Sequence, residues 1–146
     1  MAYLVDTNVL LRVAERSSTN RALAISAMRT LVQRGEKLCF TSQNLGECWN
    51  VCTRPLTSRG GLGLSLVETE RRARLLERQF TLSPDNISVH HVWRQLLVSY
   101  GIRGVGVHDA RLVAAMIVHG IPSLLTFDVA DFARYREIAV VHPGNV

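Results

Sequence analysis

The stretch YLVDTN at residues 3–8 places an aspartate directly behind a short apolar run. The apolar residues 3–5 are typical of a short buried strand, and residues 8–15 have the pattern of a helix that follows it. Asp6 therefore falls at the junction between the two elements. A strand followed at once by a helix is the unit from which parallel sheets are built, so the stretch predicts an α/β fold.

The alternation of strand and helix continues along the whole chain. Further helices are predicted over residues 20–34, 43–53, 65–79, 86–100 and 108–120, with a short helical turn at 131–135. Further strands are predicted at residues 37–41, 80–82, 122–126 and 138–141. Strands separated by helices need crossover connections, which predict a parallel sheet with helices on both faces. No linker or repeat interrupts the pattern, so residues 1–146 are expected to form a single domain.

Acidic residues stand at the ends of these predicted elements. Asp6 and Asp128 each follow an apolar run, and Asp109 lies at the start of a predicted helix. In an open parallel sheet, ligands bind beyond the carboxyl ends of the strands, where Asp6 and Asp128 are expected. Carboxylates gathered in one pocket repel each other unless a hard cation neutralises them. The pattern therefore predicts a site for Mg²⁺, with Mn²⁺ as a plausible substitute, because no histidine or cysteine joins the set.

Three of the acids have competing interpretations. Asp6 has the side chain of a helix cap, but we expect Thr7 or Asn8 to cap the first helix and leave Asp6 for the metal. Asp131 is either an accessory ligand or the cap of the helical turn.

Glu47 is the third of these acids. It lies between Leu45 and Trp49 on a largely apolar helix, where an unpaired carboxylate would be costly. It is an inward ligand, part of an exposed helix face, or one half of a local ion pair with Arg54, and we favour the ligand.

The charge of the chain favours a polyanionic partner. The net charge is +5, and all but one of the 17 basic residues are arginine, whose planar guanidinium suits phosphate. Codon usage in a GC-rich genome is the alternative explanation for the arginine excess. The candidates for phosphate contacts are the arginines near segments that carry a site carboxylate: Arg12, Arg54, Arg59 and Arg111.

Other features narrow the class of protein. No apolar run is long enough to cross a membrane and no signal peptide is recognisable, so a cytoplasmic location is expected. The three cysteines are expected to be reduced core residues; a Zn²⁺ site that includes Cys48 and Cys52 is the alternative. The glycine-rich loop at residues 57–63 is predicted to be exposed and mobile. The sequence has no phosphate-cradling loop and no G-x-S-x-G nucleophile elbow, which argues against nucleotide binding and serine hydrolases. It lacks the second aspartate that a haloacid-dehalogenase-type phosphatase needs. It also lacks the late lysine of a response-regulator receiver domain.

Four motifs, taken in their order along the chain, resemble those of PIN-domain nucleases, and within them the VapC toxins of bacterial toxin–antitoxin modules. They are LVDTN at residues 4–8, QNLGE at 43–47, HDA at 108–110, and LTFD at 125–128 with Asp131 and Phe132. The resemblance implies a three-layer α/β/α fold and a metal-dependent endoribonuclease acting on RNA. It also implies a homodimer and inhibition by a small antitoxin protein that blocks the site.

The resemblance also assigns roles to residues. By position, the catalytic metal ligands would be Asp6, Glu47, Asp109 and Asp128. The residues around them would be Thr7 as a supporting polar group, Thr126 as part of the site lining and Asp131 as an accessory acid. The longer loop at 53–63 and Phe127 depart from the family pattern, and both bear on the choice of substrate.

Two other functions use the same residues. One is a PIN-like module that binds RNA or a protein without cutting, although such a module would normally have lost one or more of the acids. The other is a metal-dependent nuclease that acts on DNA, such as a flap nuclease, although no helical arch or DNA-binding appendage is evident.

Overall fold

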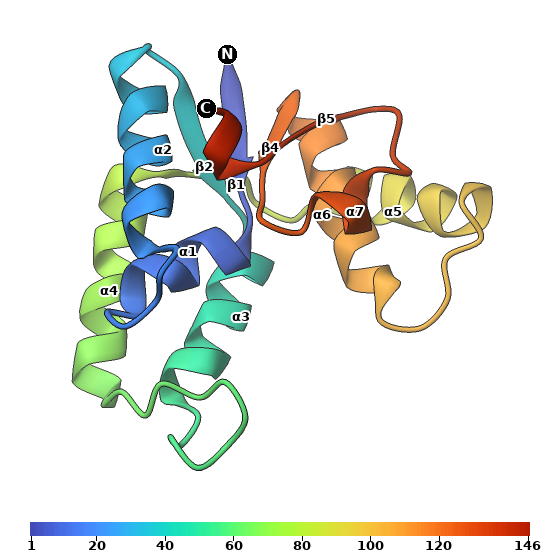
Figure 1. Ribbon diagram of the computed structural model, residues 1–146. Helices are drawn as coiled ribbons and strands as arrows, with labels where there is room; N and C mark the ends of the chain where they lie inside the picture. The colour runs from blue at the N-terminus through green and yellow to red at the C-terminus, as the bar shows by residue number, and fades with distance from the viewer.

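The computed structural model describes residues 1–146 and contains one five-stranded sheet (Figure 1). Its strands, in the spatial order β3-β2-β1-β4-β5, are β1 (Ala2–Val5), β2 (Lys37–Phe40), β3 (Thr81–Leu82), β4 (Ser123–Leu125) and β5 (Ala139–Val141). Every pairing is parallel, as the alternation of strands and helices predicts. The helices are α1 (Thr7–Ala14), α2 (Arg21–Gln33), α3 (Ser42–Thr53), α4 (Leu66–Gln79), α5 (Ile87–Ser99), α6 (Gly106–His119), α7 (Val129–Phe132) and the 3-10 helix η1 (Pro143–Asn145).

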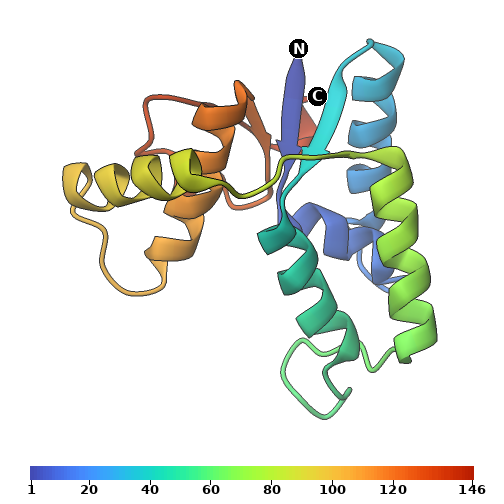
Figure 2. The same cartoon turned by 180° about the vertical axis from the view of Figure 1, so that it is seen from behind.

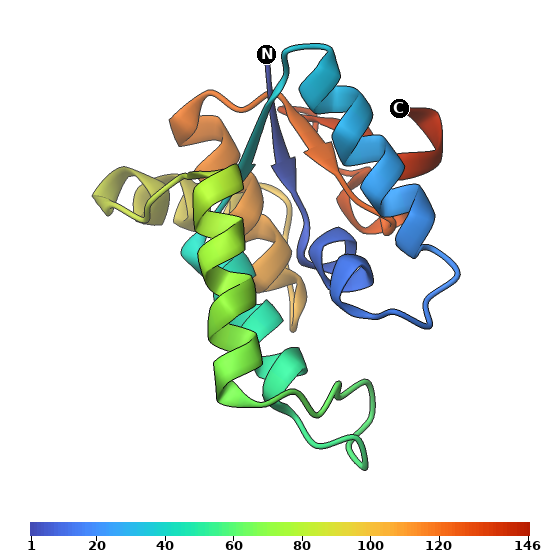
Figure 3. The same ribbon diagram turned by 90° about the vertical axis from the view of Figure 1, so that its left-hand side faces the viewer.

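The sheet has a hydrophobic core on each face. Successive residues of a strand point to opposite faces, so Leu4 and Leu124 pack with α5 and α6, whereas Val5 and Leu125 pack with α1 and α2. Figure 3 shows the central strands between α2 and α6. In Figure 2, α3 leads away from the sheet and α4 returns beside it. This arrangement confirms the predicted three-layer α/β/α fold.

Two helices begin two residues earlier than predicted, whereas the starts of the others differ from the prediction by one residue. α6 begins at Gly106, so Asp109 lies in its first turn rather than at its start. α7 spans Val129–Phe132, whereas the predicted turn covered residues 131–135. Sequence rules place helix starts at capping side chains, but neither Val105 before α6 nor Asp128 before α7 makes a side-chain cap hydrogen bond. The predicted starts are therefore late by about half a turn.

The glycine-rich loop after α3 is tied back to the end of that helix. The backbone N–H groups of Leu62, Gly63 and Leu64 donate to the carbonyls of Val51, Arg54 and Cys52. Gly61 fits because it lacks a side chain: a Cβ atom there would lie 2.2 Å from the Pro55 carbonyl oxygen. The loop is largely exposed, as predicted, but its backbone is hydrogen-bonded rather than loosely attached.

The cysteines are free thiols, as predicted, with Cys39 and Cys52 buried and Cys48 half-buried. Burial is the main cause that raises the pKa of Cys48 to about 12, so this thiol stays protonated and unreactive.

No helix in the structure combines the length and the apolar character that crossing a membrane requires.

Candidate active site

Asp6 lies directly beyond β1, at the carboxyl edge of the sheet. Its backbone N–H donates to the carbonyl of Leu125 in β4 at 3.0 Å. One carboxylate oxygen accepts from the Thr7 backbone N–H at 2.8 Å and caps α1, and the other accepts from Thr126 Oγ1 at 2.7 Å. The prediction that Thr7 or Asn8 would cap α1 is wrong, because α1 begins at Thr7 and leaves Asp6 in the cap position.

Asn8 connects the ends of β1 and β4. Its side-chain Nδ2 lies 3.2 Å from Asp6 Oδ2 and 3.0 Å from Asp128 Oδ2, and its Oδ1 accepts from the Phe127 backbone N–H at 3.2 Å. One amide group therefore holds both carboxylates on the same side of the sheet edge. Sequence reasoning treated Asn8 only as a possible cap and missed this role. The available signal was its position two residues after an aspartate at a strand end.

Glu47 points toward the same edge from α3. Its carboxylate accepts from Thr7 Oγ1 at 2.8 Å and from Gln43 Nε2 at 2.9 Å, and it makes no ion pair with Arg54. The fully buried Asn44 donates to Thr7 Oγ1 at 3.1 Å, so the threonine hydroxyl is held while it donates to Glu47. The alternatives of an exposed helix face and of an ion pair with Arg54 are both wrong, because Glu47 is half-buried and bonds to Thr7 and Gln43. Its inward position agrees with the favoured interpretation, and its role as a ligand stays a prediction.

Electrostatic effects connect the remaining acids. Burial and the charges of Asp131, Glu47 and Asp128, in that order, raise the pKa of Asp109 to about 6. Burial, opposed by hydrogen bonds and reinforced by the charges of Asp109 and Glu47, raises the pKa of Asp6 to about 6. Asp109 thus lies close enough to each of the other four acids to be repelled by them. Asp131 lies inside α7, so it is not the cap of that helix.

The structure contains no group of three or more aspartate, glutamate, histidine or cysteine side chains that could together hold a metal ion in their present positions. The carboxylates accept hydrogen bonds from hydroxyl and amide groups instead. Their chemistry nevertheless suits a hard cation, because every candidate ligand is an oxygen and the repulsion between the acids would be relieved by a divalent charge. The residues fit Mg²⁺ in kind and in charge.

The four candidate arginines lie outside this group of acids. Arg12 pairs with Glu15 at 2.7 Å, and Arg111 pairs with Asp85 at 2.6 Å. Arg54 donates to the carbonyl of Arg59 at 3.3 Å within the glycine-rich loop. None of the four forms an ion pair with a site carboxylate.

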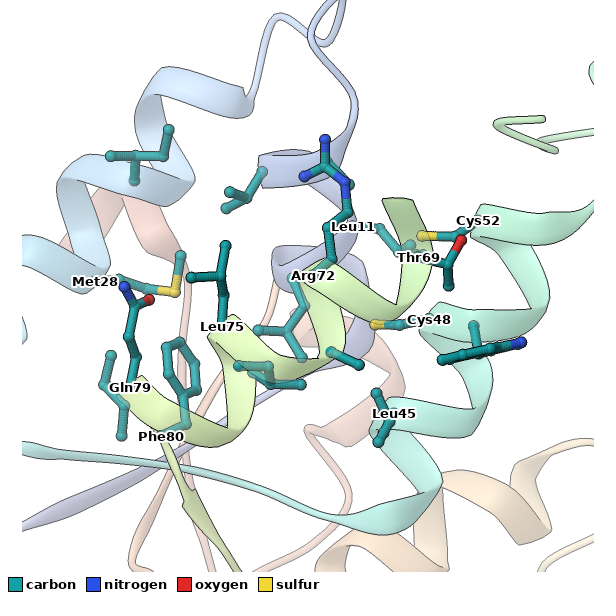
Figure 4. A pocket seen from close by; sticks show the side chains of 18 of the residues that line it. Leu11, Met28, Leu45, Cys48, Cys52, Thr69, Arg72, Leu75, Gln79 and Phe80 are labelled. Carbon is teal, nitrogen blue, oxygen red and sulfur yellow. The ribbon is translucent and has the colours of Figure 1, made fainter. Parts of the chain in front are cut away.

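A large apolar groove lies on the other side of α3. It has a volume of about 720 Å³ and is formed by residues of α1, α2, α3 and α4. Figure 4 shows Leu75 of α4 and Met28 of α2 pointing into the same space, with Cys48 of α3 on the opposite wall. The Nε atom of Arg72 is buried beside it without a hydrogen-bond partner. Sequence reasoning did not predict the groove.

Removing the Asp109 charge should stabilise the metal-free protein above about pH 6. Its raised pKa means that the stability contributed by protonated Asp109 is present below pH 3.8 and is lost as the pH rises through about 6. Asp109→Asn should escape this loss. Near pH 7 its free energy of unfolding should exceed that of the wild type by about 1 kcal/mol, after allowance for screening at a half-exposed site. That corresponds to a rise of about 2–4 °C in the melting temperature.

Thermal scans in a metal chelator at about pH 4 and about pH 7 measure this effect. The gain should be seen only at the higher pH. An equal difference between variant and wild type at both pH values would contradict the electrostatic coupling among the acids.

The comparisons with known proteins agree with this fold. The family model described as PIN domain matches residues 3–138. No curated protein matches the chain in sequence. VapBC2 from Rickettsia felis, bound to a DNA fragment from its promoter, has a TM-score of 0.71 and 14% identity, over 97% of this chain and 98% of that one.

Two further solved structures have the same fold. A toxin–antitoxin complex from Klebsiella pneumoniae has a TM-score of 0.68 and 19% identity, with 99% of each chain covered. VapC20 from Mycobacterium tuberculosis, a sarcin–ricin loop cleaving toxin, has a TM-score of 0.66 and 19% identity, over 94% of this chain and 98% of that one. At these identities the likeness concerns the fold.

Proposed function

The chain belongs to the PIN domain family, and we propose that it is a metal-dependent endoribonuclease that acts as the toxin of a toxin–antitoxin module. The proposed reaction is hydrolysis of phosphodiester bonds in RNA, in the cytoplasm, by a homodimer. The strongest support is the meeting, at one edge of the sheet, of acids from separate segments of the chain: Asp6, Glu47, Asp109 and Asp128.

These four carboxylates are the proposed ligands of Mg²⁺, for which Mn²⁺ can substitute, and Asp131 adds negative charge beside Asp109. A bound divalent cation supplies a contact for a phosphate oxygen and lowers the pKa of an attacking water. A positive charge would stabilise the ionised carboxylates, because burial and mutual repulsion raise the pKa values of Asp6 and Asp109 in its absence.

Hydrogen bonds hold three of the proposed ligands, Asp6, Glu47 and Asp128, in position before a cation binds. Thr126 donates to Asp6, Asn8 donates to both Asp6 and Asp128, and Thr7 donates to Glu47. Such outer partners fix the rotamers of ligating carboxylates and so reduce the reorganisation that metal binding requires. Thr7 and Thr126 are therefore proposed as supporting residues.

The proposed path of the RNA follows α3. Glu47 lies in the first half of this helix, and the loop with Arg54 and Arg59 follows its end (Figure 1). Arg59 is exposed, which suits a phosphate contact. Arg12 and Arg111 each already pair with an acid, so a phosphate would have to compete with Glu15 and Asp85 for them.

Comparison of RNA with DNA separates the proposed function from its rivals. In Mg²⁺ the purified protein should cleave total RNA, and it should cleave single-stranded and flapped DNA at least roughly tenfold more slowly, since the 2′-hydroxyl distinguishes the two polymers. The same assay in a chelator gives the background. Faster cleavage of flapped DNA would favour the DNA nuclease, and binding of RNA without cleavage of either polymer would favour the non-catalytic module.

The apolar groove is the proposed docking site of the antitoxin. The Klebsiella pneumoniae relative was solved as a toxin–antitoxin complex, which supports a partner of this kind. An amphipathic helix lays its apolar face into a groove of this composition. Arg72 pairs with Glu68 through Nη2 at 3.4 Å, but its buried Nε has no acceptor, which is costly and favours an acidic residue on that helix. Arg29 also lines the groove and adds positive charge.

A further inference from the structure

One side chain crosses the gap between the two helices that carry Glu47 and Asp109. Gln43, in the first turn of α3, donates from Nε2 to Glu47 Oε1 at 2.9 Å and to the backbone carbonyl of His108 in α6 at 2.9 Å. Asp109 is the next residue after His108. Figure 1 shows α3 and α6 as two separate helices below the sheet and to its right.

The orientation of the Gln43 amide follows from its partners. Both neighbours of Nε2, a carboxylate and a carbonyl oxygen, can only accept, so the NH₂ group must face them. The other end of the amide, Oε1, is buried and has no donor within the protein. A buried acceptor left without a donor costs free energy, which indicates that this orientation is maintained by the two donated bonds.

The helices themselves do not depend on this bridge. α3 is started by the reciprocal hydrogen bonds between Thr41 and Asn44. α6 is held to the segment before α5 by the Arg111–Asp85 ion pair and by the contact of His119 with the Pro84 carbonyl. What Gln43 adds is a fixed relation between the Glu47 carboxylate and the backbone that carries Asp109.

We propose that Gln43 is a positioning residue that sets the separation of Glu47 and Asp109 for binding of a divalent cation. The inference rests on the proposed function, because it concerns the same site. In this proposal Gln43 contacts neither the substrate nor the reacting atoms. It acts through Glu47 and through the first turn of α6. Because no three of the acids are grouped tightly enough to hold an ion in the present arrangement, the affinity for the ion is expected to depend on their relative placement.

The direct test measures Mn²⁺ affinity by titration, with the free ion followed by electron paramagnetic resonance. Gln43→Leu, which keeps the approximate size but removes both hydrogen bonds, should weaken Mn²⁺ binding about tenfold. The matched control is Gln95→Leu, which changes an exposed glutamine on α5 and should bind as wild type. Thermal scans in a chelator establish that both variants are folded, and Gln43→Ala serves in place of Gln43→Leu if the leucine variant is not.

A double-mutant cycle distinguishes positioning from general loosening. If Gln43 acts through Glu47, Gln43→Leu should weaken Mn²⁺ binding much less in a Glu47→Gln background than in the wild type. Equal losses in both backgrounds, or wild-type affinity of Gln43→Leu, would overturn the inference while leaving the proposed function in place. Failure of the wild-type protein to bind Mn²⁺ at all would overturn the proposed function, and the inference with it.

Discussion

Asp109→Asn should lower the rate of Mg²⁺-dependent RNA cleavage by at least about a thousandfold, and Asp6→Asn should do the same. Each change replaces a charged ligand with a neutral amide of almost equal volume. The neutral amide does not supply the negative charge that holds the cation. A weakly held cation in turn stabilises the attacked phosphate less. Gel assays of purified wild type and variants on the same RNA, with and without a chelator, measure the loss.

Two controls make this result specific to the site. Glu77→Gln removes an exposed carboxylate on α4 and should cleave as wild type. The second control is the stability of Asp109→Asn, which should be at least that of the wild type in a chelator, so that lost cleavage cannot be attributed to unfolding. Chelator-sensitive cleavage by Asp109→Asn at the wild-type rate would refute its assignment as a metal ligand.

Leu75→Glu should weaken binding of the antitoxin about a hundredfold while leaving RNA cleavage unchanged. Leu75 is 46% exposed and faces the apolar groove (Figure 4), so a glutamate there is tolerated in the free toxin. In the complex it would be an unpaired charge buried against an apolar helix face, which is strongly unfavourable. Titration with the proposed antitoxin, and relief of inhibition in the cleavage assay, measure the effect.

The matched control lies on the same helix. Val67 is 81% exposed and is not part of the groove, so Val67→Glu introduces the same charge on α4 away from the proposed contact. It should bind the antitoxin as wild type does. If Leu75→Glu binds equally well, or if both variants lose binding to the same extent, the groove is not the docking site.

The strand-end acids could be predicted because their signal is local. Asp6 and Asp128 follow apolar runs, and in a parallel sheet the ends of such runs lie at one edge. The alternation of short apolar runs with helical segments likewise made the layered fold predictable. Glu47 was recognisable because a carboxylate on an apolar helix needs a partner.

The rest of the site has no comparable signal. Asn8 and Gln43 are amides, which occur at helix starts and on surfaces for many reasons, and only the assembled fold shows which acceptors they meet. The start of α6 was misplaced because Val105 offers no capping side chain. The groove depends on the spacing between α2 and α4, and the alternating arginine and glutamate residues of α4 indicate only a solvated face.

Asp6 carries out two tasks with one side chain, since it starts α1 with one oxygen and faces the other acids with the second. A random inactivating change at this codon would therefore disturb folding and chemistry together. Asparagine is the substitution that best separates them, because its amide oxygen can still cap α1, whereas its amide nitrogen removes the charge and the acceptor that Thr126 and Asn8 use. Asp6→Asn should therefore give an inactive but folded protein, which is suitable for overproduction in a living host and for capture of the proposed partner.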